Sequence, residues 1–558
     1  MADLEKLVKN AKVVYYSMEY GFKPSVRVYS GGLGILSGDT MKSAADLEIP
    51  LIGIGLLYQD GYFQQDISDG IQQEYYDSFD PKWLMSEVKL KHPLHVKIEG
   101  RTVNLKAWAY EVKGNTGHTI PVFFLDTFHN EHDADRKICN TLYGGDRRHR
   151  CKQEVVLGIG GTKLVHMLGA TPDTYHLNEG HGAFVGVELI KRFGLEEAKN
   201  KIVFTTHTPV PAGHDWFSYN EAFGIIQEDM PHNIKDLAGH DKLNMTTLAL
   251  NTSRYANAVA KLHGEVAKGM HDGHEIDYIT NGVHSYTWTA PAMRNLFNRI
   301  KPNWQPEDLD EIAKKVQSED LLAAHMLVKE RLIEYANQYN ETGAELTPEK
   351  PVFGFARRMA EYKRATLIFD DIERLIDISN GNLQLIFAGK AHPHDQPAKR
   401  LIAEIFNHAK DLRGKVEIAF IPDYDMHIGE LMTAGSDVWL NTPMPPQEAS
   451  GTSGMKSAHN AVPTASFIDG WWYEAQPKGG WSIGVEPQTR DLVQTDNKTD
   501  AQMLYDVVQN EILPAISSVD PYVIKMREAL SNAAFFNTHR MVRDYAKKAY
   551  HLKLKAKQ

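Results

Sequence analysis

The chain has 558 residues, of which 42% are hydrophobic and 24% are charged, and its formal net charge is −11. This composition excludes a disordered or fibrous protein, and the negative charge disfavours nucleic acid or an anionic membrane as a partner. One hydrophobic core rarely serves more than about 300 residues, so we expect two domains. The two cysteines, Cys139 and Cys151, cannot form a disulfide framework, which suits a reducing compartment.

No stretch of the sequence approaches the ~20 apolar residues that a membrane-spanning helix needs. The longest apolar run, at residues 49–58, has the length of a strand and is interrupted by glycine. Residues 1–10 mix both signs of charge and lack the apolar core of a signal peptide. We therefore expect a cytoplasmic protein.

Short apolar runs rich in β-branched residues alternate with helical patterns along the chain. Near-continuous apolar strands separated by helices predict parallel sheets that are covered on both faces. Between two series of such strands, the charged stretch from Pro306 to Tyr339 is helical in pattern and contains no expected strand. The two series lie at residues 13–16, 51–57, 122–125 and 202–205, and at 352–355, 383–388, 416–420 and 437–440.

These patterns predict an α/β protein with two doubly wound domains. We expect the first domain at residues 1–295 and the second at 296–558, with linking helices at about 300–345. In doubly wound sheets, ligands bind beyond the carboxyl ends of the strands, and a cleft between two domains is the favoured site.

A glycine turn, Ser30-Gly-Gly-Leu-Gly34, precedes a helical pattern at residues 37–46. Glycines such as Gly31 and Gly32 at a helix entrance let backbone N–H groups approach an anion, and the helix dipole favours the negative charge. The same motif also fits a tight turn that binds nothing, so this motif alone leaves both interpretations open.

Two histidines, His181 and His207, each follow a strand-like run and would therefore face the ligand edge of a sheet. Each position fits either a structural or a catalytic side chain. The 25 histidines include no His-Glu-X-X-His pair or other metal-binding spacing, so we predict no metal site.

A basic segment follows the expected strand at 352–355 and carries Arg357, Arg358, Lys363 and Arg364. Guanidinium groups bind phosphate through paired hydrogen bonds, and lysine binds it as a point charge. The segment therefore predicts an anion site carried by a loop. The alternative is a solvated basic patch that pairs with neighbouring acids.

A loop of small residues, Glu448-Ala-Ser-Gly-Thr-Ser-Gly-Met-Lys456, follows the last expected strand. It lacks the glycine spacing of a P-loop. Lys456 would lie near the first turn of a helix, which is a suitable place for a lysine that forms a Schiff base with a phosphorylated aldehyde cofactor. Taken alone, an exposed lysine at a helix start is the more frequent explanation of such a position.

Together these motifs resemble the α-glucan phosphorylases, which act on glycogen, starch or maltodextrin, and in particular their short prokaryotic branch. Glu448–Lys456 is similar to the family's pyridoxal-phosphate lysine signature, residues 30–34 to its cofactor-phosphate turn, and residues 357–364 to its substrate-phosphate segment. Further matches run in family order over residues ~13–470, at Tyr16–Glu19, Leu177–His181, Thr206–Thr208, Asn257–His263 and Asn281-Gly282. The chain departs from the family's usual residues at Gly21, where a tyrosine is usual, and at Ser30, Arg357 and Ser453-Gly454.

The resemblance implies a GT-B fold, with two Rossmann-like domains and the active site between them. It implies reversible phosphorolysis of the non-reducing-end glucosyl unit of an α-1,4-glucan, which gives glucose 1-phosphate with retention of configuration. The expected partners are this glucan, orthophosphate and glucose 1-phosphate, and a homodimer stays open. The expected cofactor is pyridoxal 5′-phosphate, whose 5′-phosphate would contact the substrate phosphate and relay a proton.

The resemblance also implies roles for single residues. Lys456 is expected to carry the cofactor, and its phosphate is expected to contact Gly31, Gly32, Arg357, Thr452 and Ser453. The catalytic set is completed by Arg358 and Lys363 on the substrate phosphate and by His207, which would present its backbone carbonyl to the reacting sugar. The sugar is expected to lie against Glu19, His181, Asn281, Tyr362, Glu448, Ser450 and Gly451.

Cations are needed where two phosphates meet. Two unit charges ~4 Å apart repel by about 4 kcal/mol at an effective dielectric constant of ~20, and two nearly dianionic phosphates would roughly quadruple that repulsion. Arg357, Arg358 and Lys363 supply the opposite charge.

Two other functions remain as alternatives. A nucleotide-sugar-dependent retaining glucosyltransferase, such as a glycogen-synthase-like enzyme, would use the glycine turn and the basic pair but not Lys456. A catalytically silent glucan-binding protein would need none of Arg358, Lys363 and Lys456. Because only about twelve residues precede the expected strand at Val13, the resemblance implies no regulatory N-terminal segment, and we expect no allosteric control.

Overall fold

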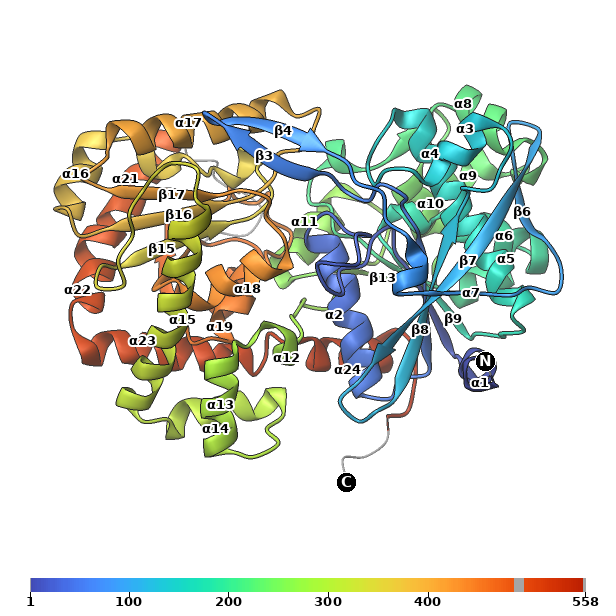
Figure 1. The fold of residues 1–558 in the computed structure, drawn as a ribbon. Helices are drawn as coiled ribbons and strands as arrows, with labels where there is room; N and C mark the ends of the chain where they lie inside the picture. Colours follow the sequence, from blue (N-terminus) through green and yellow to red (C-terminus); the bar gives the residue numbers. More distant parts are fainter. Residues whose placement is uncertain (1, 486–495, 555–558) are drawn as a thin grey trace.

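The computed structural model describes residues 2–485 and 496–554, which form two large sheets with helices packed around them (Figure 1). The architecture is α/β, as predicted, and each large sheet contains one of the two expected series of strands. The first sheet runs in the order β14 (Asp277–Tyr278), β13 (Tyr255–Ala258), β10 (Ile202–Thr205), β9 (Thr174–Asn178), β1 (Val13–Tyr16), β2 (Leu51–Leu56), β8 (Thr119–Asp126), β7 (Arg101–Lys113) and β5 (Ser86–Glu87), with β6 (Leu94–Ile98) paired to β7.

The central strands of the first sheet are parallel and buried. β1 pairs in parallel with both β2 and β9, and all four of its residues are buried. The run of four apolar and aromatic residues in β1 suits this place, because both faces of the strand are covered.

One edge of the first sheet is antiparallel, in contrast to the expected parallel sheet. β7 pairs antiparallel with β8, β6 and β5. Buried and less buried residues alternate along the first part of β7. Such alternation is typical of an antiparallel strand with one face toward solvent, and it differs from the continuous apolar runs on which the prediction was based.

The second sheet is parallel throughout. Its strands follow the order β17 (Glu417–Ile421), β16 (Gln384–Ala388), β15 (Val352–Ala356), β18 (Val438–Asn441), β19 (Thr464–Phe467) and β20 (Gly480–Ile483). The helices α16 (Ile372–Ser379), α17 (Gln396–Asp411) and α18 (Met426–Gly435) lie between its strands in the chain. The stretch between the two sheets is helical, with α13 (Pro291–Ile300), α14 (Leu309–Lys315) and α15 (Ser318–Tyr339).

The last helix, α24 (Thr538–Lys548), packs against the first sheet. Met541, Val542 and Tyr545 belong to the hydrophobic core of that sheet. In Figure 1, α24 lies beside α2 (Gly32–Asp46), which follows β1 in the chain. The helix therefore packs with residues on the other side of the boundary predicted at residue 295, and the division into domains stays a prediction.

A hairpin of β3 (Gln64–Ser68) and β4 (Ile71–Tyr75) extends from the first half of the chain over the second sheet (Figure 1). Ile67 is buried in the core of the second sheet. The Gln65 amide donates to the carbonyl oxygen of Gly389 and the Gln72 amide to that of Ala391, both at 2.9 Å. The hairpin thus ties the two halves of the molecule together.

No helix among the described residues combines the length and the apolar character that a bilayer crossing requires.

Candidate active site

A cavity of about 890 Å³ lies where strands of both sheets end. Its lining comes from segments after the carboxyl ends of β1, β9, β10 and β14 in the first sheet and of β15 and β18 in the second. This is the usual place of a ligand site in doubly wound sheets. All of the predicted site residues line the cavity, while their individual roles stay predictions: Glu19, Gly31, Gly32, His181, His207, Asn281, Arg357, Arg358, Tyr362, Lys363, Glu448, Ser450, Gly451, Thr452, Ser453 and Lys456.

The glycine turn is held in place by Glu19. One oxygen of this carboxylate accepts hydrogen bonds from the backbone N–H groups of Ser30 (2.6 Å) and Gly31 (3.1 Å), and the other accepts one from the Tyr143 hydroxyl (2.7 Å). α2 begins at Gly32, so its first N–H groups lack partners within the helix. A Cβ added to Gly31 or Gly32 would meet no atom within 4 Å. The turn therefore leaves room for an anion at the helix start.

Gly21, where a tyrosine is usual in the family that the sequence resembles, packs closely against α2. A Cβ on Gly21 would lie 2.7 Å from Cδ1 of Ile35, and a Cβ on Gly38 would lie 2.0 Å from the Gly21 carbonyl oxygen. In this chain, α2 occupies the space that a side chain at position 21 would need.

Arg357 and Lys363 both bind Glu448. Arg357 Nη2 lies 2.6 Å from Oε2 of Glu448, and Lys363 Nζ lies 2.7 and 2.6 Å from its two oxygens. Burial by itself would raise the pKa of Glu448, but the two cations outweigh burial and lower the pKa to about 2. The ionised carboxylate thus neutralises part of the positive charge that the sequence predicts for an anion.

The other two cations of the basic segment differ from each other. Arg358 lines the cavity, and its positive charge interacts with the phenol groups of neighbouring tyrosines such as Tyr362. Arg364 is instead buried, forms an ion pair with Asp500, and donates to the carbonyl oxygen of Pro443 at 2.7 Å. Arg358 is therefore placed to bind an anion, whereas Arg364 holds the segment to its surroundings.

Lys456 lies in α19 (Ser453–Ala458), the short helix predicted after the small-residue loop. Its side chain is buried, which rules out the alternative of an exposed lysine, and Nζ lies 3.8 Å from the centre of the Trp288 ring. Burial lowers the pKa of Lys456 to about 8, so part of the amine is neutral near neutral pH. A buried and partly neutral amine is a suitable nucleophile for a carbonyl group.

Several buried polar atoms of the cavity-lining residues have no hydrogen-bond partner among the described residues. They are Oδ1 of Asn281, Oγ of Ser450, Nε of Arg357 and Nδ1 of His181. A buried polar group without a partner costs about 1–3 kcal/mol. A ligand with hydroxyl or phosphate groups would supply the missing partners.

The two predicted histidines are held by their neighbours. The His207 backbone N–H donates to Oε2 of Glu179 at 2.7 Å, and its ring Nε2 lies 2.6 Å from Oδ1 of Asn178. Burial lowers the pKa of His207 to about 4, so its ring is neutral at neutral pH. His181 Nε2 lies 3.3 Å from Oδ2 of Asp215.

Three residues at the cavity carry interactions that the sequence did not reveal. Trp288 lies against Lys456, Tyr143 binds Glu19, and Glu179 holds the backbone of His207. Glu179 belongs to a motif that was matched, so its position was a usable signal. A buried aromatic residue such as Trp288, by contrast, has no sequence pattern that separates it from a core residue.

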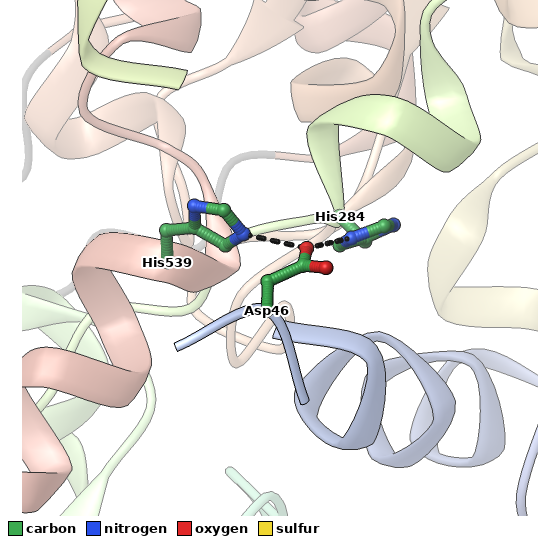
Figure 2. A group of neighbouring side chains, drawn as sticks. All are labelled: Asp46, His284 and His539. Carbon is green, nitrogen blue, oxygen red and sulfur yellow. Dashed lines mark hydrogen bonds and ion pairs between the residues drawn. The ribbon is translucent and has the colours of Figure 1, made fainter. Parts of the chain in front are cut away.

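A second cluster of ionisable side chains lies apart from the cavity lining. Figure 2 shows Asp46 between His284 and His539, whose Nε2 atoms lie 2.9 and 2.8 Å from the same oxygen of Asp46. These ligand atoms lie within 4.8 Å of one another, a spacing that could hold a metal ion. Hydrogen bonds already account for the geometry, and the positive charge of Lys42, which acts on His284, disfavours a cation there.

Comparisons with known proteins agree on one family. The model of the carbohydrate phosphorylase family matches residues 24–128 and 222–480. The chain is 40% identical to a maltodextrin phosphorylase of Thermococcus litoralis, in an alignment that covers 96% of this chain and 70% of that protein. It is 34% identical to a glycogen phosphorylase of Aquifex aeolicus, with 96% and 86% covered, and 34% identical to one of Mycobacterium tuberculosis, with 96% and 70% covered.

Proposed function

Because the chain belongs to the carbohydrate phosphorylase family, we propose that it catalyses reversible phosphorolysis of α-1,4-glucans with pyridoxal 5′-phosphate bound at Lys456. The chain is an enzyme of the glycosyltransferase type, and its two-sheet architecture is of the GT-B type. The proposed products are glucose 1-phosphate, with configuration retained, and a glucan shorter by one glucosyl unit. The activities named for its relatives, maltodextrin and glycogen phosphorylase, support a glucan as the substrate.

The proposal rests mainly on the residues that line one cavity. The buried amine of Lys456, the open glycine turn and the cations Arg357, Arg358 and Lys363 all line it. A retaining glucosyltransferase that uses a nucleotide sugar would need the turn and the cations but would have no use for a buried lysine of lowered pKa. A protein that only binds glucan would need none of these features.

The residues around Lys456 fit pyridoxal phosphate. The space beside Gly31 and Gly32 would hold its phosphate at the start of α2, and the neutral fraction of the Lys456 amine would bind its aldehyde carbon. When bound, the cofactor supplies a phosphate group that can exchange a proton with the substrate phosphate. Gly31, Gly32 and Thr452 would hold that group, because they line the same cavity as Lys456.

The basic segment would bind orthophosphate beside the cofactor. Within the basic segment, Arg358 lines the cavity and forms no ion pair with a carboxylate among the described residues, in contrast to Arg357 and Lys363. Arg357 and Lys363 would each exchange some of their hydrogen bonds to Glu448 for hydrogen bonds to the phosphate. The bonds lost and gained are both charge-assisted, at about 1.5–3 kcal/mol each, and a dianionic phosphate offers more negative charge and more acceptor oxygens than one carboxylate.

The reacting sugar would lie against His207 and Asn281. The His207 backbone carbonyl accepts no hydrogen bond from the described residues, so its partial negative charge is free to face the positive charge that develops at the anomeric carbon. Oδ1 of Asn281 would accept a hydrogen bond from a sugar hydroxyl. Glu179, which binds the backbone N–H of His207, would keep that carbonyl in position.

An assay of glucose 1-phosphate tests the proposal. Purified protein incubated with maltodextrin and orthophosphate should release glucose 1-phosphate in proportion to orthophosphate at low concentration. Lys456→Ala should abolish the release, while Lys498→Ala, which changes an exposed lysine of α21 (Asn497–Val507), should leave it intact. Glucosyl transfer from a nucleotide sugar without release of glucose 1-phosphate would instead support the glucosyltransferase.

A further inference from the structure

Trp288 lies under the side chain of Lys456. Nζ is 3.8 Å from the ring centre, and Trp288 is only 1% exposed. An ammonium group over the face of an indole is stabilised by about 2 kcal/mol when the pair is desolvated. The orientation of the ring therefore affects the amine, and that orientation depends on the groups that hold Trp288.

The indole N–H of Trp288 is held by Asp39, a buried residue of α2. Trp288 Nε1 donates to Oδ2 of Asp39 at 2.7 Å, and the His284 backbone N–H donates to the same oxygen at 3.0 Å. The other oxygen of Asp39, Oδ1, is buried and has no hydrogen-bond partner among the described residues. One side of this buried carboxylate therefore keeps its negative charge uncompensated by hydrogen bonding.

Trp288 ends the one-turn helix α12 (Ser285–Trp288), which is also tied to the end of α19. The Asn460 side chain donates to the carbonyl oxygens of Trp288 at 2.7 Å and of Lys456 at 3.1 Å. Oγ of Ser285 lies 2.8 Å from Nε2 of His459. The backbone of Trp288 is thus fixed from the side of Lys456, and its ring is fixed from the side of α2.

His284, the second donor to Asp39, is fixed in turn. Its ring binds Asp46 through Nε2 at 2.9 Å, as Figure 2 shows, and Thr287 through Nδ1 at 2.8 Å. Lys42 Nζ donates to Oγ1 of Thr287 at 3.0 Å. Both donors to Asp39 are therefore held rigidly.

We propose that Asp39 is a positioning residue for Lys456. Asp39 orients the Trp288 ring beneath the lysine and supplies a buried negative charge near the lysine amine. The inference rests on the proposed attachment of pyridoxal phosphate to Lys456. It adds the residues that prepare the amine for that attachment.

The charged groups that act on the Lys456 amine come from α2 and α18. Burial is the largest effect and lowers the pKa, Asp39 and then Glu430 raise it, and Lys42 lowers it, with the result that the pKa is about 8. Removal of the negative charge of Asp39 would lower the pKa further, because an opposite charge favours the protonated amine.

Competitive acetylation of Lys456, followed by peptide mass mapping, tests the inference in the full-length protein freed of cofactor. The wild-type amine should react with a midpoint near pH 8. Asp39→Asn keeps an oxygen acceptor for Trp288 but loses the charge, and its midpoint should fall by about half a pH unit or more.

Asp46→Asn is the matched control for this experiment. This substitution also removes a negative charge from α2, at a residue that also contacts His284. Asp46, however, is not among the charged residues that shift the pKa of Lys456. Its midpoint should equal that of the wild type. An unchanged midpoint in Asp39→Asn, or an equal shift in Asp46→Asn, would overturn the role of Asp39.

Reloading with pyridoxal phosphate separates this inference from the proposed function. At pH 7 the absorbance of the bound cofactor should return about two- to threefold faster in Asp39→Asn, because a fall of half a unit in the pKa of Lys456 enlarges the neutral fraction of its amine. A wild-type protein that never reloads contradicts the proposed function, whereas identical reloading in both proteins contradicts only the role of Asp39. If Asp39→Asn does not fold, Trp288→Phe, which keeps a ring but lacks the N–H, should show a smaller shift in the same direction, and no shift would overturn the inference.

Discussion

Arg358 is the cation whose loss should affect orthophosphate binding most directly. It lines the cavity, and its electrostatic neighbours are phenols. Arg358→Ala removes charge-assisted hydrogen bonds worth about 1.5–3 kcal/mol, so kcat/KM for orthophosphate should fall roughly 10- to 150-fold. Thermal unfolding should stay close to wild type, because no buried ion pair is broken. Steady-state rates at subsaturating orthophosphate provide the measurement.

Arg364 offers the matched control in the same segment. It is buried and forms an ion pair with Asp500, so Arg364→Met removes this ion pair and the hydrogen bonds of a buried guanidinium. This change should lower the thermal unfolding midpoint, while any remaining folded enzyme keeps its KM for orthophosphate. Wild-type kinetics in Arg358→Ala would show that the phosphate site lies elsewhere.

Glu448 should make the stability of the fold depend on acid pH. Its pKa falls from a usual value of 4.5 to about 2, because Arg357 and Lys363 outweigh the effect of burial. A carboxyl group with a depressed pKa stabilises the folded state above its unfolded pKa, and this contribution is lost as the pH falls from 4.5 to about 2.

Glu448→Gln should therefore lower the stability of the protein at pH 6, by on the order of 3 kcal/mol. The difference from wild type should shrink as the pH falls below 4.5 toward 3, because the wild-type carboxylate loses its advantage between pH 4.5 and about 2. Thermal unfolding of both proteins between pH 6 and pH 3 measures this. A difference that does not change with pH would show that the ion pairs of Glu448 add no stability.

At the scale of elements, α2 offers a matched pair of glycine substitutions. A Cβ on Gly38 would lie 2.0 Å from the Gly21 carbonyl oxygen, whereas a Cβ on Gly32 would meet nothing within 4 Å. Gly38→Ala should destabilise the fold by about 1–3 kcal/mol or more, seen as a lower unfolding midpoint. Gly32→Ala should keep or slightly raise the midpoint, because alanine favours a helix, but should release pyridoxal phosphate faster on dialysis. Equal midpoints in the two variants would contradict the close packing of α2 on Gly21.

Strands composed mainly of apolar residues were predictable from the sequence, including β16 with its buried Gln384, whereas strands with more polar residues were harder to predict. All eight expected strands are present, within a residue or a few at their ends. β9 is not one of these eight strands, although a strand-like run was expected before His181, because His176 and Thr174 interrupt its apolar run. His176 is nevertheless buried, since its ring binds Tyr550 at 2.6 Å and Thr205 at 2.8 Å. Such partners are distant in sequence, so no local pattern announces them.

The hairpin of β3 and β4 shows the same limit. Its docking depends on Gln65 and Gln72. Their side-chain amides donate hydrogen bonds to backbone carbonyl oxygens just after β16 of the second sheet, as peptide N–H groups do between strands. The Gln72 oxygen also accepts the backbone N–H of Ala391 at 2.9 Å. Glutamine is common on protein surfaces, so its presence in a polar hairpin predicts exposure and not docking.

At the scale of the whole molecule, α24 joins the end of the described chain to the first sheet. The Tyr545 hydroxyl lies 3.1 Å from Oγ1 of Thr205 in β10 and 3.0 Å from Nδ2 of Asn257 in β13. Tyr545→Ala would remove a buried ring and cost about 3–5 kcal/mol of stability. Hydrogen exchange should then accelerate in β10 and β13 more than in β15 and β16. Uniform acceleration across both sheets would show that the molecule unfolds as one unit.

Membership of the candidate site was predictable, whereas its internal pairing was not. The motif residues line one cavity because they follow strands whose carboxyl ends meet at the sheet edges. The bonds between them join distant positions: Lys363 and Glu448 are 85 residues apart, and Asp39 and Trp288 are 249 apart. The pairing of β15 with β18 brings Lys363 and Glu448 together, and the packing of α2 brings Asp39 to Trp288; a single sequence reveals neither arrangement.

The proposed function depends most on Lys456 as the residue that carries pyridoxal phosphate in an enzyme that cleaves glucans with orthophosphate. Reduction of the active enzyme with borohydride, followed by digestion and peptide mass mapping, tests this claim directly. We expect a pyridoxyl group on the peptide that contains Lys456, because its amine is buried in the cavity with a lowered pKa. A pyridoxyl group on another lysine, or active enzyme that acquires none, would contradict it.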